Sequence, residues 1–198
     1  MLITRRGLIG SVAAMAAMPA FAPVSALAAP CGPIVDAARR ALAIHGAAAG
    51  ARDVVGVADF SHASSDRRFH LVDMSNGRVS SFLVAHGRGS DPEHSGWLKR
   101  FSNDEGSSAT SAGVYLTAGE YQGKHGRSMR LKGLDATNNN AEPRAVVVHG
   151  AWYVSPQILA EHGKLGRSEG CFAFSEIDLP GVLEQLGPGR LITAGKFS

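Results

Sequence analysis

After residue 50, hydrophobic positions alternate with polar or small ones, which is the period of half-buried β-strands. Three such runs cover residues 55–57, 69–71 and 79–83. Asn76-Gly77 separates the second run from the third and is a strong signal for a tight hairpin turn. Three further strands are predicted, at residues 113–117, 129–131 and 190–193, and a glycine-rich turn is predicted over residues 121–126, between the first two.

A continuous run of β-branched residues, Val146 to Val148, predicts a fully buried strand. We expect this strand to be central in its sheet. It ends in His149-Gly150, so an imidazole stands at the point where the strand stops.

Three segments have helical spacing instead of alternation: residues 33–45, 156–162 and 179–186. Pro33 suits a first helical turn, and Gly46 ends that segment. Ser155-Pro156 fits an N-cap followed by a first-turn proline. Gly187-Pro188 stops the last of the three.

Many short strands with few short helices favour a mainly β fold, either a β-sandwich or a barrel-like sheet. Residues 87–111 follow neither period and are rich in Gly, Ser, Asp and Asn. Loops of this length inside a compact domain are usually lids or binding loops. Trp97, Leu98 and Phe101 are suited to hold this one against the body.

The chain has 198 residues, 44% of them hydrophobic and 19% charged, which predicts a packed core in one domain with appendages. The net charge of +3 includes Arg5 and Arg6 near the N-terminus. The remaining arginines are scattered and form no basic stripe, which argues against a nucleic acid partner. We expect a monomer.

The N-terminus has the pattern of an export signal. Arg5-Arg6 precedes an apolar run over residues 8–22, and Ala26-Leu27-Ala28 supplies small residues at a cleavage site. The run is shorter than the ~20 residues of a membrane span, so no stable membrane anchor is expected. The predicted organisation is a cleaved twin-arginine-type signal over residues 1–28, a helix and linker over 29–50, and a domain over 51–198.

The candidate chemistry lies at His149 and Cys171. Gly166 and Gly170 allow a tight turn immediately before the cysteine. A cysteine nucleophile needs a base that is close in space rather than in sequence, and His149 is the candidate. The backbone N–H groups of Gly170 and Cys171 are candidates to bind the oxyanion of an attacked carbonyl.

The order His-Gly, then Ser-x-Gly-Cys, resembles the L,D-transpeptidase catalytic domain family, in particular its murein L,D-transpeptidase branch. Further likeness extends over residues 54–193, in segments such as Val84-Ala-His-Gly, Gly113-Val-Tyr and Tyr121-Gln-Gly-Lys-His-Gly. Many members have a histidine two residues before the cysteine and an arginine two residues after it. Glu169 and Ala173 occupy those positions here, so the roles of those two residues do not carry over.

The resemblance implies an L,D-transpeptidase-type β fold and a peptidoglycan stem peptide as substrate, with no cofactor. Arg167 and Ser168 are the candidates to bind its carboxylates. His86 is a candidate to line the cleft or contact substrate, with a structural role as the alternative. Tyr115 and Tyr153 are expected to contact the peptide or to fill the core, and Trp152 to fill the core.

No paired-cysteine or His-Glu-x-x-His spacing is present, so a metal site is not predicted. Three functions stay open. The first is a periplasmic L,D-transpeptidase that passes an acyl group to an amine, and the second is an L,D-carboxypeptidase that passes it to water. The third is a non-catalytic cell-wall binding domain stapled by a Cys31–Cys171 disulfide, since exported proteins commonly pair their cysteines.

Overall fold

The structure, a computed structural model, describes residues 32–198. The predicted export signal and Cys31, and with it the predicted alternative of a disulfide, lie outside these residues. Within residues 32–198, none of the helices has the length and apolar character needed to cross a membrane.

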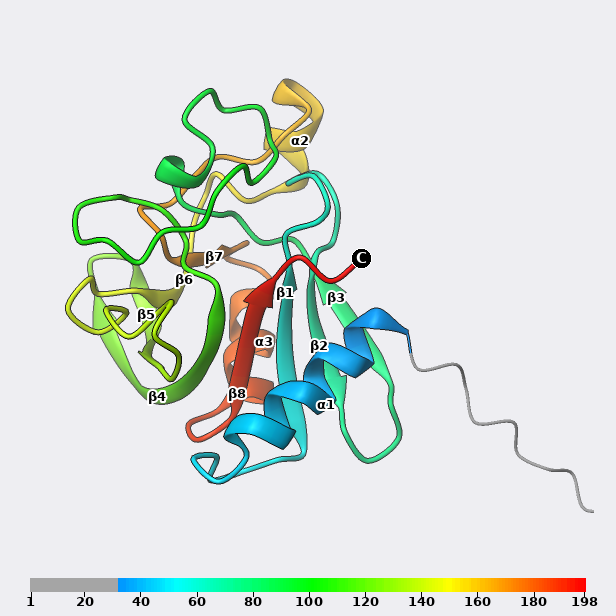
Figure 1. The fold of residues 1–198 in the computed structure, drawn as a ribbon. Coiled ribbons are helices and arrows are strands. Elements are labelled where there is room, and N and C mark those ends of the chain that lie inside the picture. Colours follow the sequence, from blue (N-terminus) through cyan, green and yellow to red (C-terminus); the bar gives the residue numbers. More distant parts are fainter. Residues whose placement is uncertain (1–31) are drawn as a thin grey trace, which may run out of the picture.

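One eight-stranded sheet forms the body of the protein, in the order β3-β2-β1-β8-β4-β5-β6-β7 (Figure 1). Its strands are β1 (Val54–Asp59), β2 (Phe69–Asp73), β3 (Val79–Phe82), β4 (Gly113–Gly123), β5 (Gly126–Gly133), β6 (Val147–Gly150), β7 (Phe172–Phe174) and β8 (Leu191–Gly195). The helices are α1 (Pro33–His45), α2 (Pro156–His162), α3 (Leu179–Leu186) and a 3₁₀ turn, η1 (Arg88–Ser90). The predicted mainly β fold is confirmed.

The two edges of the sheet meet. The chain that leaves β3 forms an antiparallel bridge from Ala85 to Ala173 of β7, and a second bridge joins Gly87 to Ser168. Because β3 and β7 are the outermost strands, these bridges draw the sheet toward closure. The barrel-like form predicted from the strand pattern is therefore the one observed.

The main core lies inside this curved sheet. Two edge-to-face aromatic pairs stand in it: Phe69 with Phe174, at 4.8 Å between ring centroids, and Tyr115 with Phe172, at 5.3 Å. α3 adds its apolar face to the same core through Leu179, Val182, Leu183 and Leu186. The aromatic pairs fix β7 against the body, which matters because Cys171 directly precedes this strand.

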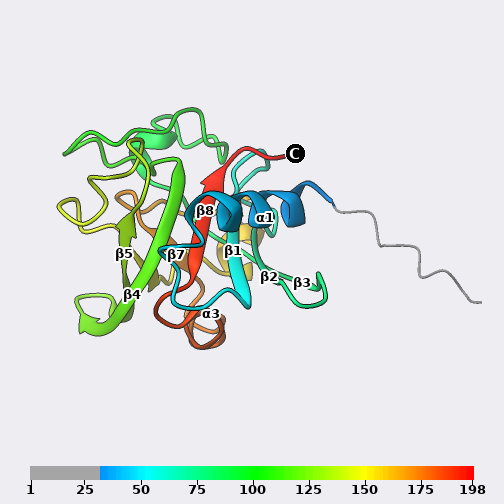
Figure 2. The same cartoon turned by 60° about the horizontal axis from the view of Figure 1, so that its bottom comes forward.

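α1 covers the other side of the sheet. Ala37, Ala38 and Ala41 of the helix pack with apolar residues of β1, β2, β4 and β8 in a second cluster. Figure 2 shows α1 lying across β8 and β1, with α3 on the opposite side. The predicted boundary at residue 51 separates this helix from the main domain, whereas in the structure the helix belongs to the same body.

Three local expectations are corrected by the structure. β6 is next to the edge strand β7 rather than central, because the sheet is completed by β7, which was not predicted as a strand. The predicted turn over residues 121–126 is two residues long, because β4 and β5 extend into it and form one long hairpin. Trp152 is 71% exposed rather than in the core.

Candidate active site

The parallel pair β6 and β7 places the two candidate residues on one surface. Val148 pairs with Phe172, and both side chains point into the main core. Side chains alternate along a strand, so His149 on β6 and Cys171, just before β7, lie on the opposite face. Both line one cavity of about 420 Å³. The structure thus brings the predicted thiol and imidazole to the same cleft.

The loop that delivers Cys171 requires glycine at position 170. Gly170 has φ +116°, and a Cβ there would lie 2.8 Å from the carbonyl oxygen of Ala109. Arg144 binds that same carbonyl oxygen, and its Nη1 donates to the carbonyl of Ser102 at 3.0 Å. The turn before the nucleophile is therefore held tightly against the loop of residues 87–111.

Ser168 stabilises this loop through two hydrogen bonds of its hydroxyl to the loop backbone. Its hydroxyl donates to the carbonyl of Cys171 at 2.7 Å and accepts from the N–H of Gly170 at 3.2 Å. Ser168 lines the cavity, but its hydroxyl is engaged by the backbone, so the predicted contact with substrate is replaced by a role in shaping the loop. The N–H of Gly170, a predicted oxyanion donor, is likewise bonded in this state.

Residues 85–88 support the same loop from the neighbouring edge. The N–H of Ala85 donates to Ala173 at 2.9 Å, and the N–H of Ser168 donates to the carbonyl of His86 at 2.9 Å. The N–H of Arg88 then donates to Ser168 at 2.8 Å. Of residues 87–111, none lines the cavity, and in this structure the loop packs against the nucleophile loop from behind.

Two neighbours define the state of His149. Its Nδ1 is 2.8 Å from the carbonyl oxygen of Gly150, so Nδ1 carries the proton and Nε2 keeps the lone pair. His125, in the turn between β4 and β5, stacks on the ring with 4.2 Å between centroids and 22° between planes. The imidazole is thereby oriented with Nε2 as its basic atom.

Burial shifts the two groups in opposite directions. It raises the pKa of the Cys171 thiol, although the backbone of Val147 and the cations Lys124 and Arg144 act the other way. It lowers the pKa of His149, and His125 and Lys124 add to that decrease. Both shifts favour the neutral thiol and the neutral imidazole over an ion pair.

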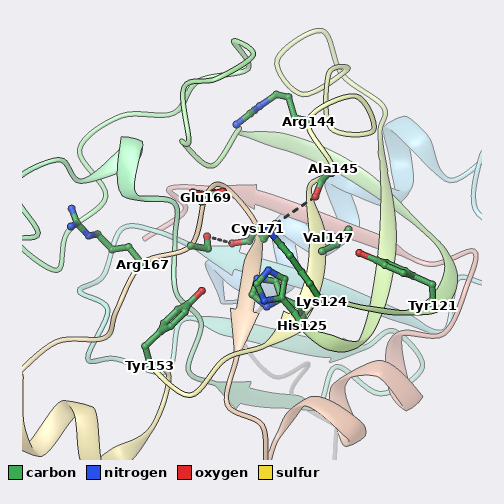
Figure 3. Close-up of a pocket in the computed structure, with 12 residues that line it drawn as sticks. Tyr121, Lys124, His125, Arg144, Ala145, Val147, Tyr153, Arg167, Glu169 and Cys171 are labelled. Atoms are coloured by element: carbon green, nitrogen blue, oxygen red, sulfur yellow. Dashed lines mark hydrogen bonds between the residues drawn. The ribbon is translucent and has the colours of Figure 1, made fainter.

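The cavity is rich in cationic side chains. Lys124, Arg144 and Arg167 line it together with His125, and Glu169 is the one carboxylate among the described residues around it. Figure 3 shows Lys124 extending toward Cys171. Such a cleft favours a substrate that carries carboxylates next to the bond under attack.

Arg167 lies differently from the expectation. Its side chain extends away from Cys171 (Figure 3), and Nη1 donates to the carbonyls of Asp91 and Pro92. Lys124 is therefore better placed than Arg167 to meet a carboxylate near the nucleophile, whereas the guanidinium of Arg144 is held by the carbonyls of Ser102 and Ala109. Neither Lys124 nor Arg144 is a candidate from the sequence alone, because Lys124 lies in a predicted turn and Arg144 at the start of a predicted strand.

Two further candidates are buried away from the cleft. His86 is 1% exposed, and its Nδ1 accepts a 2.6 Å hydrogen bond from Arg68, which is itself fully buried. Tyr115 is fully buried and its hydroxyl donates to the carbonyl of Ser111 at 2.7 Å. The predicted substrate contacts of these two residues are corrected accordingly. Their roles are structural, the alternative that the sequence analysis left open for both.

Residues 32–198 contain no group of three His, Cys, Asp or Glu side chains arranged to hold a metal ion. The site that the structure assembles consists of a thiol, an oriented imidazole and several cations. This set suits nucleophilic attack on a carbonyl.

The family model described as the L,D-transpeptidase catalytic domain matches residues 35–194. The chain belongs to the L,D-transpeptidase catalytic domain family. The match begins inside α1 and ends in β8, so it includes every strand of the sheet and both walls of the cleft. Members of this family are cell-envelope enzymes that act on peptidoglycan. The curated proteins contain no sequence that matches this L,D-transpeptidase domain.

Solved structures with similar folds include three from different bacteria. An L,D-transpeptidase from Mycobacterium smegmatis has a TM-score of 0.43 and 16% identity, over 72% of this chain and 58% of its own. L,D-transpeptidase 3 from Mycobacterium tuberculosis, in complex with a faropenem-derived adduct, has a TM-score of 0.45 and 16% identity, over 73% and 60%. The helical cell shape determining protein Pgp2 from Campylobacter jejuni has a TM-score of 0.47 and 11% identity, over 73% and 47%. The chain spans less than two thirds of each.

Proposed function

We propose that this protein is a periplasmic L,D-transpeptidase that works through a cysteine acyl-enzyme. The observation that carries the proposal is the placement of Cys171 and an oriented His149 on one face of the β6–β7 pair, at a cation-lined cleft. The donor substrate is a peptidoglycan stem peptide, as in the family. The protein acts as a monomer, without a cofactor.

In the first half-reaction the Cys171 sulfur attacks the carbonyl carbon of the L,D amide bond. Nε2 of His149 takes the thiol proton, which creates the nucleophile when substrate is present. The tetrahedral intermediate collapses when the C–N bond breaks, and imidazolium donates its proton to the leaving amine. The products are a D-amino acid and a thioester at Cys171.

In the second half-reaction an amine of another stem peptide attacks the thioester. His149 takes a proton from this amine, the C–S bond breaks, and the sulfur leaves as thiolate and recovers the proton from imidazolium. The net result is an amide cross-link and free enzyme. Water in place of the amine would give the L,D-carboxypeptidase reaction with the same residues.

The negative charge of each tetrahedral intermediate requires donors. The N–H of Cys171 and the ammonium of Lys124 serve this role, joined by the N–H of Gly170 once it leaves the Ser168 hydroxyl. Lys124 and Arg144 also attract the carboxylate of the leaving D-amino acid. Glu169, 65% exposed on its side chain and paired with Arg88 at 3.1 Å, is an acceptor only and cannot donate to the oxyanion.

The test is incubation of the mature protein with a defined donor stem peptide and an amine acceptor, followed by mass analysis of the products. We expect cross-linked product and released D-amino acid from the natural sequence, and neither from the Cys171→Ala variant. Hydrolysed donor without cross-links would replace the transpeptidase with the carboxypeptidase. An unchanged donor would contradict both enzymatic functions.

A further inference from the structure

A second cavity, of about 370 Å³, lies where the same two strands end. One wall is made by the chain that leaves β6 after His149, from Ala151 to Gln157. The other is made by the chain that leaves β7 after Cys171, from Ser175 to Asp178. Both segments that carry the catalytic residues thus continue directly into this cavity.

The wall of the second cavity contains two large apolar side chains that are exposed to solvent. Trp152 is 71% exposed and Ile177 is 89% exposed, and both line it. Large apolar side chains exposed together mark binding surfaces more often than chance contacts. Leu83 and Val154 form an apolar floor beneath them, whereas Arg67, Gln157 and Glu176 supply polar groups. This combination provides one flat apolar contact and several hydrogen-bonding groups.

The second cavity neighbours the catalytic cleft. Trp152 and Tyr153 are consecutive, and their rings stand edge to face with 5.8 Å between centroids. Tyr153 lines the catalytic cavity and Trp152 lines the second one. Val154 and Ala173 belong to one apolar cluster, which lies on the same face of β7 as Cys171. A single extended ligand can therefore contact both cavities.

The distance from Cys171 to the second cavity matches the length of a stem peptide. From Cys171 to Ser175 the chain runs along β7, and four extended residues cover about 13 Å. A stem peptide is joined by its N-terminus to a muramic acid of the glycan, a few residues before the bond that is cleaved. Three or four extended residues of that peptide cover about the same distance.

Charge sets the direction of the peptide in the cleft. The leaving residue carries a free carboxylate, which the cations Lys124 and Arg144 at the catalytic cavity favour. The second cavity presents the carboxylates Glu176 and Asp178 and so disfavours that end. The sugar is uncharged, because its own carboxyl forms the amide bond to the peptide.

We propose that the second cavity binds the glycan end of the donor, with a pyranose ring of an N-acetylated sugar stacked on Trp152. This inference rests on the proposed function and extends it to the part of the substrate that precedes the stem peptide. A pyranose has an apolar C–H face that matches the indole ring. Its hydroxyl and acetamido groups are partners for Arg67, Gln157 and Glu176.

A binding measurement tests the proposal without any turnover. The chain has two tryptophans, Trp97 and Trp152, so Trp97→Phe leaves fluorescence that reports on Trp152 alone. We expect the peptide-free disaccharide of N-acetylglucosamine and N-acetylmuramic acid, with the muramic carboxyl capped as a simple amide so that the sugar is uncharged, to change this signal with saturation. In the matched Trp152→Phe variant, the remaining Trp97 should give no change. Absence of a saturable change in the Trp97→Phe variant would overturn the proposal, even if the enzyme is active.

A kinetic comparison tests the same site during catalysis. In the natural sequence we expect kcat/KM to be higher for a disaccharide-linked stem peptide than for the free peptide. The kcat/KM for the disaccharide-linked peptide divided by that for the free peptide gives the ratio to follow. Trp152→Ala should lower this ratio roughly three- to tenfold, the scale of one aromatic contact. Ile44→Ala, which removes an exposed apolar side chain on α1, should leave the ratio as it was. A ratio unaffected by Trp152→Ala would overturn the proposal, as would a Trp152 signal that responds to the free peptide and not to the disaccharide.

Discussion

Cys171 and His149 differ from a preformed thiolate–imidazolium pair because burial acts on both. The pKa of the thiol is raised and that of the imidazole is lowered, and both shifts favour the proton on sulfur. A neutral thiol is a weak nucleophile and is protected from unwanted reactions in the free enzyme. The cations Lys124 and Arg144 partly offset the effect of burial on the pKa of the thiol.

The first prediction concerns the pH dependence of this thiol. Alkylation of Cys171 by iodoacetamide should accelerate with pH through an apparent pKa above that of a free cysteine, because the thiolate is the reactive form. The rate is measured by mass spectrometry in the free enzyme between pH 5 and about pH 10. A plateau of fast alkylation already present near neutral pH would show a resting ion pair and contradict this account.

The second prediction concerns the base. His149→Ala should slow acylation of Cys171 by about 10²–10⁴-fold, because Nε2 no longer takes the thiol proton. Single-turnover acylation with a donor stem peptide measures the effect. His162→Ala, an exposed position on α2, is the matched control and should change the rate less than twofold. If the two variants acylate at similar rates, His149 is not the base.

At the scale of elements, the nucleophile loop depends on contacts from distant parts of the chain. Ala109 from the long loop, residues 85–88 after β3, and Arg144 before β6 all meet it. None of these contacts leaves a local pattern in the sequence. This is why the sequence predicted the glycine turn and the thiol but not the residues that surround them.

The third prediction tests this support at Gly170. Gly170→Ala places a Cβ 2.8 Å from the Ala109 carbonyl oxygen at a φ of +116°, so the turn must move. We expect acylation to fall by at least about tenfold, since displacement of a reacting group by 1 Å already costs more than this. Gly163→Ala is the control, because it also has a positive φ but open space for its Cβ. Equal activity in the two variants would show that the turn does not position Cys171.

Local signals predicted some elements well. Pro33 and Gly46 bound α1 as expected, and Asn76-Gly77 joins β2 to β3. β7 was missed because it is only three buried residues long, Phe172 to Phe174, and is a strand through its parallel pairing with β6, which no local pattern shows. The role of His125 also escaped prediction, since the turn reaches His149 only through the pairing of β5 with β6.

At the scale of the whole molecule, the closure of the sheet around buried polar groups links stability to the site. Arg68 is fully buried and donates to Val84 and to Nδ1 of His86. His86 Nε2 lies 3.5 Å from a carboxylate oxygen of Asp91, whose other bonds organise the start of the long loop. The bridge residues 85–88 begin at this cluster, so its integrity holds the sheet edges together.

The fourth prediction is that His86→Ala lowers the free energy of unfolding by about 2–4 kcal/mol, from a lost partner for Arg68 and a small cavity. Burial lowers the pKa of His86 to about 3, below its unfolded value near 6.5. The unfolded chain therefore binds the extra proton between these values, so stability falls as the pH drops from about 6.5 to 3. Part of that fall should disappear in His86→Ala.

Urea unfolding at several pH values measures both effects of His86→Ala. His162→Ala serves again as the exposed control and should change stability by less than about 0.5 kcal/mol. A His86→Ala variant as stable as this control would show that the buried cluster does not hold the sheet edges together.

The most direct test of the account is the mass of the protein after reaction with a carbapenem, a β-lactam whose strained amide takes the place of the stem peptide. We predict one adduct, mapped to Cys171, in the natural sequence and in Cys31→Ala, and none in Cys171→Ala. An adduct that persists in Cys171→Ala would contradict the cysteine acyl-enzyme. So would loss of the adduct in Cys31→Ala together with a Cys31–Cys171 disulfide in the natural protein.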